Sequence, residues 1–218
     1  ANEKEVKIQT INLSIDAAEK GGYDYFMAKE IFEQPKAVKD TVSPLIKEGK
    51  IQLPFKFPEN FVKNLNRIYI VACGSAFHVG VTAKYIIEDM VRVPVIVDIA
   101  SEFRYRNPII GKGDLCIFVS QSGETADTLA SLREAKARGA FTLSIVNVLF
   151  STIARESDAV IYTNAGAEIA VATTKAFSAQ LSVAYVLSGF MAHEKGLMNG
   201  EELKNFTDEI LRLPEKIQ

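Results

Sequence analysis

Hydroxyl side chains are concentrated in residues 119–128, VSQSGETADT, directly after an apolar run. The preceding residues, DLCIFV, have the composition of a buried strand. The hydroxyls belong to Ser120, Ser122, Thr125 and Thr128, and no Lys or Arg lies between residues 113 and 132. Hydroxyls together with the free N–H groups of a helix N-terminus can bind a phosphate without any cation. The segment therefore predicts a phosphate site.

Two other loops have a similar composition. Cys73-Gly74-Ser75-Ala76 follows the apolar run RIYIVA, and Val171-Ala172-Thr173-Thr174 precedes a long apolar helix. In an open parallel sheet, ligands bind beyond the carboxyl ends of the strands, so we expect these loops to meet the Ser120-Gln121-Ser122-Gly123-Glu124-Thr125 loop. The alternative is that the Ser and Thr residues are ordinary helix caps, each contributing ~1 kcal/mol. We favour the phosphate site because the loop holds more hydroxyls than one cap uses.

Nucleotide-binding patterns are absent from the sequence. The first expected strand is not followed by G-x-G-x-x-G, and G-x-x-x-x-G-K-[ST] does not occur. These absences argue against a dinucleotide or nucleoside-triphosphate site.

Several single side chains could take part in catalysis, but the sequence pairs none of them as acid and base. Cys73 is either a nucleophile or a thiol packed at a strand end. His78 has the position of an ordinary semi-buried histidine, and Glu168 is either a proton-transfer group or a cap. Lys175 is either a phosphate or Schiff-base lysine or an ion-paired one, and Glu124 suits the start of a helix. We assign no catalytic residue.

The elements that must position these loops form an alternating pattern from residue 67 onward. Strands are expected in residues 67–74, 93–100, 114–121, 140–148 and 158–165, with helices at 76–91, 125–139, 173–196 and 200–218. Strands that are apolar throughout are buried on both faces. The pattern predicts an α/β fold, a three-layer α-β-α sandwich around a five-stranded parallel sheet, of the flavodoxin/Rossmann type.

Ahead of the sheet, the N-terminal residues predict helices rather than strands. Apolar spacing over residues 23–47 predicts two helices with a break at Pro35. Residues 1–20 are polar, and we expect them to be partly disordered.

Composition limits the class of protein. The chain has 218 residues, 48% of them hydrophobic, which suffices for one large domain. Its net charge of −2 arises from mixed signs, so we expect no nucleic-acid partner and no membrane surface. The two cysteines form either one disulfide or, the favoured alternative, two reduced thiols of a cytoplasmic protein. The two histidines are far apart, so we expect no metal and no cofactor, and we find no signal peptide or transmembrane run.

With these residues in view, the sequence resembles the sugar isomerase (SIS) domains. More narrowly it resembles the first SIS domain of the glucosamine-6-phosphate synthase family, over almost the whole chain. The motifs that carry the resemblance, in order, are EKGGYDYFMAKEIFEQP, ACGSAFH, IASEFRYR, SQSGETADTL, RESD, NAG-EI-VA-TKAF and LPEKI. The fold of that family is a parallel sheet, in agreement with the pattern above.

The resemblance implies a site for fructose 6-phosphate. The phosphate would be held by Ser120, Gln121, Ser122 and Thr125. The loop of Cys73, Gly74 and Ser75 would add hydroxyl and backbone contacts, and Val171, Ala172 and Thr173 would contact the sugar hydroxyls. Ser75 replaces a family Thr and Thr173 a family Ser, whereas Ala76 replaces a family Ser and loses one donor.

The resemblance also implies a larger protein. The family has a glutaminase domain before this region and a second SIS domain after it, and these supply the catalytic groups. We expect residues 1–50 to be a linker with helices, 51–196 the SIS domain, and 197–218 the start of a helix leading to the second SIS domain. The chain would be the sugar-phosphate-binding half of the isomerase module, in a homodimer, and inactive alone. The alternatives are a non-catalytic phosphosugar sensor and a related phosphosugar isomerase or deglycase.

Overall fold

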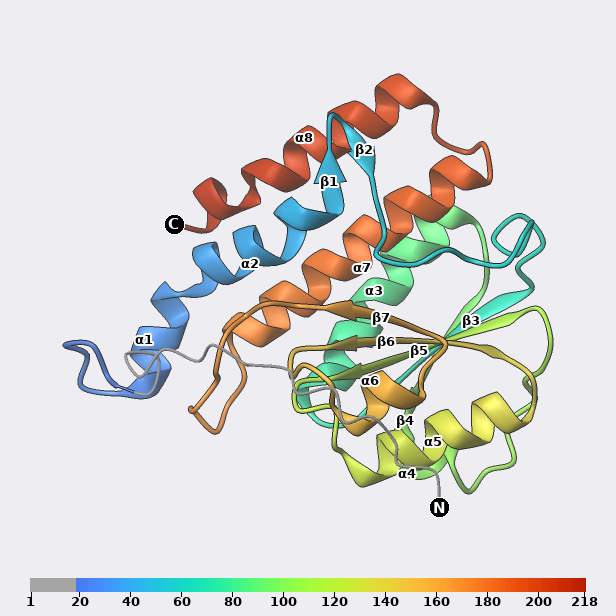
Figure 1. Ribbon diagram of the computed structural model, residues 1–218, viewed down its shortest axis with the longest axis horizontal. Coiled ribbons are helices and arrows are strands. Elements are labelled where there is room, and N and C mark those ends of the chain that lie inside the picture. The colour runs from blue at the N-terminus through green and yellow to red at the C-terminus, as the bar shows by residue number, and fades with distance from the viewer. Residues whose placement is uncertain (1–18) are drawn as a thin grey trace, which may run out of the picture.

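A five-stranded parallel sheet forms the centre of the protein, seen in a computed structural model that describes residues 19–218 (Figure 1). The strands are β3 (Arg67–Ala72), β4 (Val95–Ile99), β5 (Asp114–Ser120), β6 (Phe141–Val146) and β7 (Ala159–Tyr162). Their order is β4-β3-β5-β6-β7, and every neighbouring pair is parallel. The predicted sheet is confirmed. The expectation of disorder for residues 1–20 lies almost wholly outside the described residues.

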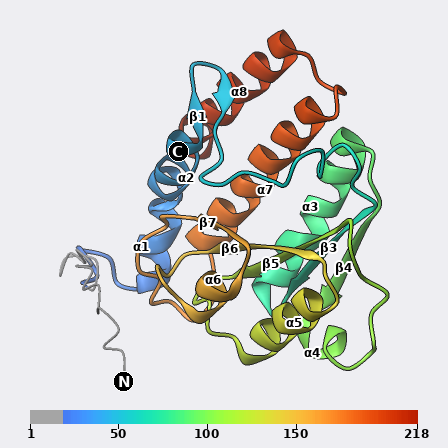
Figure 2. The same ribbon diagram turned by 45° about the vertical axis from the view of Figure 1, so that its right-hand side comes forward.

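Helices cover both faces of this sheet (Figures 1 and 2). One face packs against α3 (Ser75–Val91) and α7 (Lys175–Glu194), and the other against α4 (Ala100–Phe103), α5 (Ala126–Ala137) and α6 (Thr152–Glu156). Along β3, Ile68 and Ile70 contribute to the first core, while Tyr69 and Val71 contribute to the second. Because neighbouring side chains on a strand point to opposite faces, an unbroken apolar run fills two cores. The three-layer sandwich is confirmed.

Further helices flank α7 on the side away from the sheet. The N-terminal segment forms α1 (Phe26–Phe32) and α2 (Gln34–Val42), followed by a 3-10 turn η2 (Ser43–Leu45) and a small hairpin of β1 (Ile46–Lys47) and β2 (Lys50–Ile51). The C-terminal helix α8 (Gly200–Ile217) packs with α2 and α7 (Figure 1). The two predicted N-terminal helices are confirmed. The break precedes Pro35, which lies in the first turn of α2, where a missing N–H costs nothing.

Three observations bear on the class of protein. Both cysteines are free thiols, and burial raises the pKa of the Cys116 thiol on β5. Within residues 19–218, no three His, Cys, Asp or Glu side chains gather as a metal site would require. None of the helices in this part of the chain combines the length and the apolar character needed to cross a bilayer.

Candidate functional site

A pocket of about 200 Å³ lies at the carboxyl end of the sheet, where β3 and β5 are neighbours. After β3 the chain adds β4 on one side, and it then returns to add β5 on the other side of β3. The loops that leave β3 and β5 therefore diverge, which opens a crevice between them. The lining residues are Cys73, Ser75, Ala76, Val119, Ser120, Gln121, Ser122, Thr125, Thr173 and Gln180.

Most side chains predicted for the site meet in this pocket. All three hydroxyl-bearing loops contribute, although they lie far apart in the sequence. Gly74 belongs to the first loop but is not among the lining residues, and Val171 and Ala172 are exposed and also lie outside the lining. Of the third loop, only Thr173 lines the pocket.

The loop hydroxyls are oriented by backbone groups. The Ser120 Oγ accepts from the Gly123 N–H at 3.0 Å, and the Ser122 Oγ accepts from the Glu124 N–H at 3.2 Å. The Oγ atoms of Ser120 and Thr125 are 3.3 Å apart. Because the Ser122 oxygen accepts a hydrogen bond, its own proton remains available for another acceptor. Of the protons of Ser120 and Thr125, one can lie between these two hydroxyls, which leaves the other available. The loop can therefore donate hydrogen bonds to an anion.

The N-cap residues of the helices that begin at the pocket make no side-chain hydrogen bond to their own helix. They are Gly74 before α3, Thr125 before α5 and Thr174 before α7. The contrast is α8, where the Asn199 side chain accepts from two backbone N–H groups. Capping therefore does not account for the hydroxyl of Thr125. The positive end of α5 faces a loop whose hydroxyls are not engaged by that helix.

Gly123 and Glu124 attach the loop of residues 120–125 to α6. Gly123 has φ +65°, and a Cβ there would lie 2.0 Å from the Ser151 Oγ, so the turn requires glycine. The Gly123 carbonyl accepts from the Ile153 N–H at 3.0 Å, and the Glu124 carboxylate accepts from the Thr152 N–H at 2.7 Å. This last bond lowers the pKa of Glu124. The sequence predicted that the Glu124 carboxylate would interact with the start of the helix that follows it, α5. In the structure it accepts a hydrogen bond at the start of α6.

The third loop is held by α1 and the residue after it. The buried Glu30 carboxylate accepts from the N–H groups of Ile169 and Ala170 at 2.6 and 2.9 Å. The Lys175 Nζ donates to the Glu33 carboxylate at 2.7 Å. Lys175 is buried and does not line the pocket, so the ion-paired alternative holds and the phosphate-ligand alternative does not. The N-terminal helices thereby position the loop that carries Thr173.

Glu168 caps α7 rather than facing the pocket. Its Oε1 accepts from the N–H groups of Thr174 and Ala176 at 3.1 and 3.3 Å. Burial raises the pKa of Glu168, and Glu30 acts in the same direction, against the two N–H groups. His78 is exposed rather than semi-buried and lies outside the pocket lining. The pocket residues thus include no carboxylate and no imidazole that could move a proton.

Gln180 is a pocket residue that the sequence analysis missed. It lies on α7, is only 1% exposed, and neither amide atom has a hydrogen-bond partner among residues 19–218. The only sequence signal for it is a long polar side chain inside a helix that is otherwise apolar or small.

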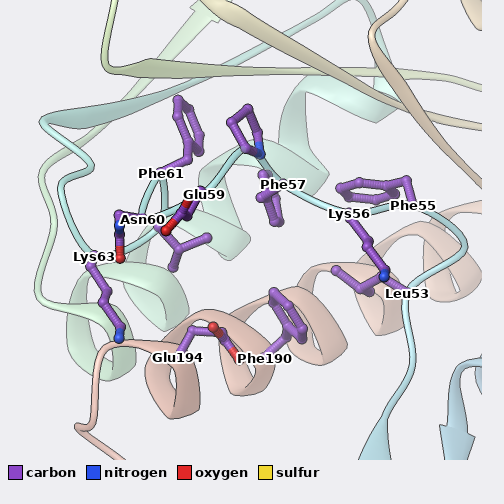
Figure 3. Close-up of a pocket in the computed structure, with 12 residues that line it drawn as sticks. Leu53, Phe55, Lys56, Phe57, Glu59, Asn60, Phe61, Lys63, Phe190 and Glu194 are labelled. Carbon is purple, nitrogen blue, oxygen red and sulfur yellow. The ribbon is translucent and has the colours of Figure 1, made fainter.

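A larger cavity, of about 310 Å³, lies beneath the loop between β2 and β3. Figure 3 shows Phe55, Phe57 and Phe61 of this loop and Phe190 of α7 around it. The Phe57 and Phe61 rings also contact the ring of Phe141, the first residue of β6, at 5.4 and 5.2 Å between centroids. The cavity therefore lies near the amino end of the sheet, and its aromatic lining packs a long loop onto α7.

Comparison with known proteins places this geometry in a family. Residues 62–188, more than half of the chain, match the SIS domain model. The chain belongs to the SIS domain family. The resemblance inferred from the sequence motifs is confirmed, and the SIS region spans the sheet, the pocket loops and most of α7.

Similar proteins are larger than this SIS chain. It is 53% identical, over 99% of its length, to the glutamine–fructose-6-phosphate aminotransferase (isomerizing) of Clostridium tetani, and 51% identical, over 98%, to that of Clostridium acetobutylicum. It covers 36% of the length of each, so it spans about a third of these relatives. A solved structure of the C-terminal domain of glucosamine-fructose-6-phosphate aminotransferase from Francisella tularensis superposes with a TM-score of 0.85 at 41% identity, covering 90% of this chain and 56% of that one.

Proposed function

We propose that the pocket between β3 and β5 binds a hexose 6-phosphate, fructose 6-phosphate or its product glucosamine 6-phosphate. The phosphate would accept hydrogen bonds from Ser120, Ser122 and Thr125 and from the N–H groups at the start of α5. The observation that carries this proposal is the combination of oriented hydroxyls with an uncapped helix start in one pocket. Hydrogen bonds to a charged oxygen contribute ~1.5–3 kcal/mol each.

The remaining loops would hold the rest of the ligand. Gln121 would complete the phosphate loop, and Cys73, Gly74 and Ser75 would offer backbone and hydroxyl contacts from the end of β3. Thr173 would reach the sugar hydroxyls, with Val171 and Ala172 shaping the loop. Ala76 lines the pocket without a donor, so this wall would contact carbon atoms. The pocket residues in the described part of the chain include no acid–base pair, so the role we propose for the pocket is to orient the sugar phosphate.

For the whole protein, we propose the activity for which the relatives are named, glutamine–fructose-6-phosphate aminotransferase (isomerizing). Residues 1–50 would be a linker with helices, residues 51–196 the SIS domain, and residues 197–218 the start of the connection to a second SIS domain. A glutaminase domain would supply ammonia. The two free thiols support a cytoplasmic location, since thiols persist in a reducing compartment.

We also propose that the protein forms a homodimer. Exposed apolar side chains lie on α1, on the N-cap residue before it, and on the loop whose N–H groups Glu30 binds. They are Tyr25, Ile31, Phe32, Ile169 and Val171. Apolar side chains gathered in this way are typical of an interaction surface.

Calorimetric titration of fructose 6-phosphate and unphosphorylated fructose tests the phosphate site. The wild-type protein should prefer the phosphorylated sugar. Ser122→Ala and Thr125→Ala should each weaken binding of fructose 6-phosphate by roughly 10- to 150-fold, because each 1.4 kcal/mol is tenfold.

Thr82→Ala is the matched control, because the Thr82 hydroxyl is exposed on α3 and donates within its own helix, to the His78 carbonyl at 3.2 Å. It should bind as the wild type does. If the wild type binds both sugars equally, or if Ser122→Ala and Thr125→Ala melt earlier but bind normally, the phosphate proposal is refuted.

A further inference from the structure

The Gln180 amide occupies an unusual position for a polar group. The side chain is 1% exposed, yet neither the oxygen nor the nitrogen has a partner in the described part of the chain. Buried polar groups nearly always have hydrogen-bond partners, because an unpaired one loses its contacts with water and gains nothing in return. The amide also lines the candidate pocket, together with residues of the loop after β3 and Thr173. A buried, unpaired polar group that lines a pocket is suited to form a hydrogen bond with a ligand bound in that pocket.

The chemistry of the amide indicates what kind of group that partner is. An amide has an acceptor oxygen and a donor nitrogen, and here both are unpaired. A phosphate dianion only accepts hydrogen bonds, so it would satisfy the nitrogen and repel the oxygen. A hydroxyl both donates and accepts, so it can satisfy either atom. This conclusion is the same whichever way the amide is turned.

We propose that Gln180 binds a hydroxyl group of the sugar and makes the pocket selective for a polyhydroxylated phosphate ester over a simple one. This inference rests on the proposed function, since it assigns the phosphate to Ser120, Ser122 and Thr125. The Gln121 Oε1 also lines the pocket and is also buried and unpaired in the described residues. The phosphate loop supplies affinity for the charged end, and Gln180 discriminates at the sugar end.

Discrimination of this kind is strong because a ligand that lacks the hydroxyl forms no hydrogen bond with the buried amide. A ligand that fills the pocket without a hydroxyl leaves the amide buried and unpaired, so binding gains nothing at this position. Sites built to hydrogen-bond a substrate hydroxyl reject analogues without it far better than apolar pockets reject an extra group. The buried amide also reduces the stability of the empty protein, a common cost of a functional site.

The test compares two ligands and two substitutions in the whole natural protein that carries this sequence. The ligands are fructose 6-phosphate and ethyl phosphate, which has the phosphate ester but no hydroxyl. Gln180→Met keeps the length of the side chain and removes both polar atoms. Gln52→Met is the matched control, because Gln52 is exposed and is not among the pocket residues.

Gln180→Met should weaken binding of fructose 6-phosphate by roughly 5- to 150-fold and change binding of ethyl phosphate by less than about twofold. The empty variant should melt at the same temperature as the wild type or higher, because a buried unpaired amide has been removed. Gln52→Met should leave both affinities unchanged. If Gln180→Met binds fructose 6-phosphate as the wild type does, the amide has a structural role or is paired with water, and the inference is overturned.

Further measurements keep the inference testable if Gln180→Met does not fold. Gln180→Leu is a second apolar variant with the same expectation. At least one deoxy analogue should bind the wild-type protein at least 5-fold more weakly than fructose 6-phosphate does. In whichever Gln180 variant folds, the difference in affinity between that analogue and fructose 6-phosphate should be smaller. Normal binding by every analogue would overturn the inference. Failure of wild type to bind either phosphate ester would instead refute the phosphate site.

Discussion

Replacing Gly123 by alanine should destabilise the phosphate loop through two separable effects. The first is the backbone, because alanine at φ +65° adopts a left-handed conformation that costs about 1–2 kcal/mol. The second is the new Cβ, which would lie 2.0 Å from the Ser151 Oγ and 2.5 Å from the Ser151 Cβ. Overpacking of this kind costs about 1–3 kcal/mol. The two effects together should lower the free energy of unfolding by about 2–5 kcal/mol.

Gly196→Ala isolates the backbone effect. Gly196 has φ +74°, and a Cβ there would meet nothing within 4 Å. The two variants should therefore differ by about 1–3 kcal/mol in the free energy of unfolding that they lose, and this difference measures the steric clash with Ser151. Ser151→Gly should relieve it in the double variant, because the Ser151 Oγ has no partner among the described residues and glycine is accepted at a helix N-cap.

Urea unfolding followed by circular dichroism gives the stabilities, and titration with fructose 6-phosphate gives the affinities. Gly123→Ala should also weaken binding at least about tenfold, since the displaced turn carries Ser122, for which we propose a hydrogen bond of ~1.5–3 kcal/mol to the charged ligand. Gly196→Ala should bind normally. The reasoning fails if the two glycine variants lose equal stability, or if Ser151→Gly does not restore any stability to Gly123→Ala.

Two other predictions concern charge and activity. Burial raises the pKa of Glu168 in the folded protein, so its contribution to stability is present below its unfolded pKa and is lost as the pH rises through the folded value. Glu168→Gln should therefore gain stability relative to wild type as the pH rises above about 4, the ordinary pKa of a glutamate. A relative loss of stability on denaturant titration would show that the hydrogen bonds of Glu168 to the start of α7 outweigh burial. The 218-residue chain alone should form no glucosamine 6-phosphate from fructose 6-phosphate and ammonia, because the pocket residues within 19–218 include no acid–base pair. Product that disappears in Ser122→Ala would contradict this.

The sheet and the pocket-lining loop after β5 could be predicted from the sequence because their signals are local. A strand such as β5 is apolar throughout, and that composition by itself indicates burial on both faces. The hydroxyls that follow it mark the carboxyl end of the strand, where ligands bind in parallel sheets. The break between α1 and α2 was placed two residues too late, because a proline is accepted in the first turn of a helix.

Only the tertiary structure decided which side chains meet. Gln180 lines the pocket because α7 packs against the sheet and α3, and its polar side chain in an apolar helix does not by itself indicate which loops it meets. Lys175 finds its partner in Glu33, 142 residues earlier in the chain, and Glu124 finds the start of α6 rather than α5. Apolar periodicity fixes the conformation of each segment and the face it buries, because it reflects interactions within a few residues. The neighbours across that face depend on how distant segments pack, and no short stretch of sequence contains that information.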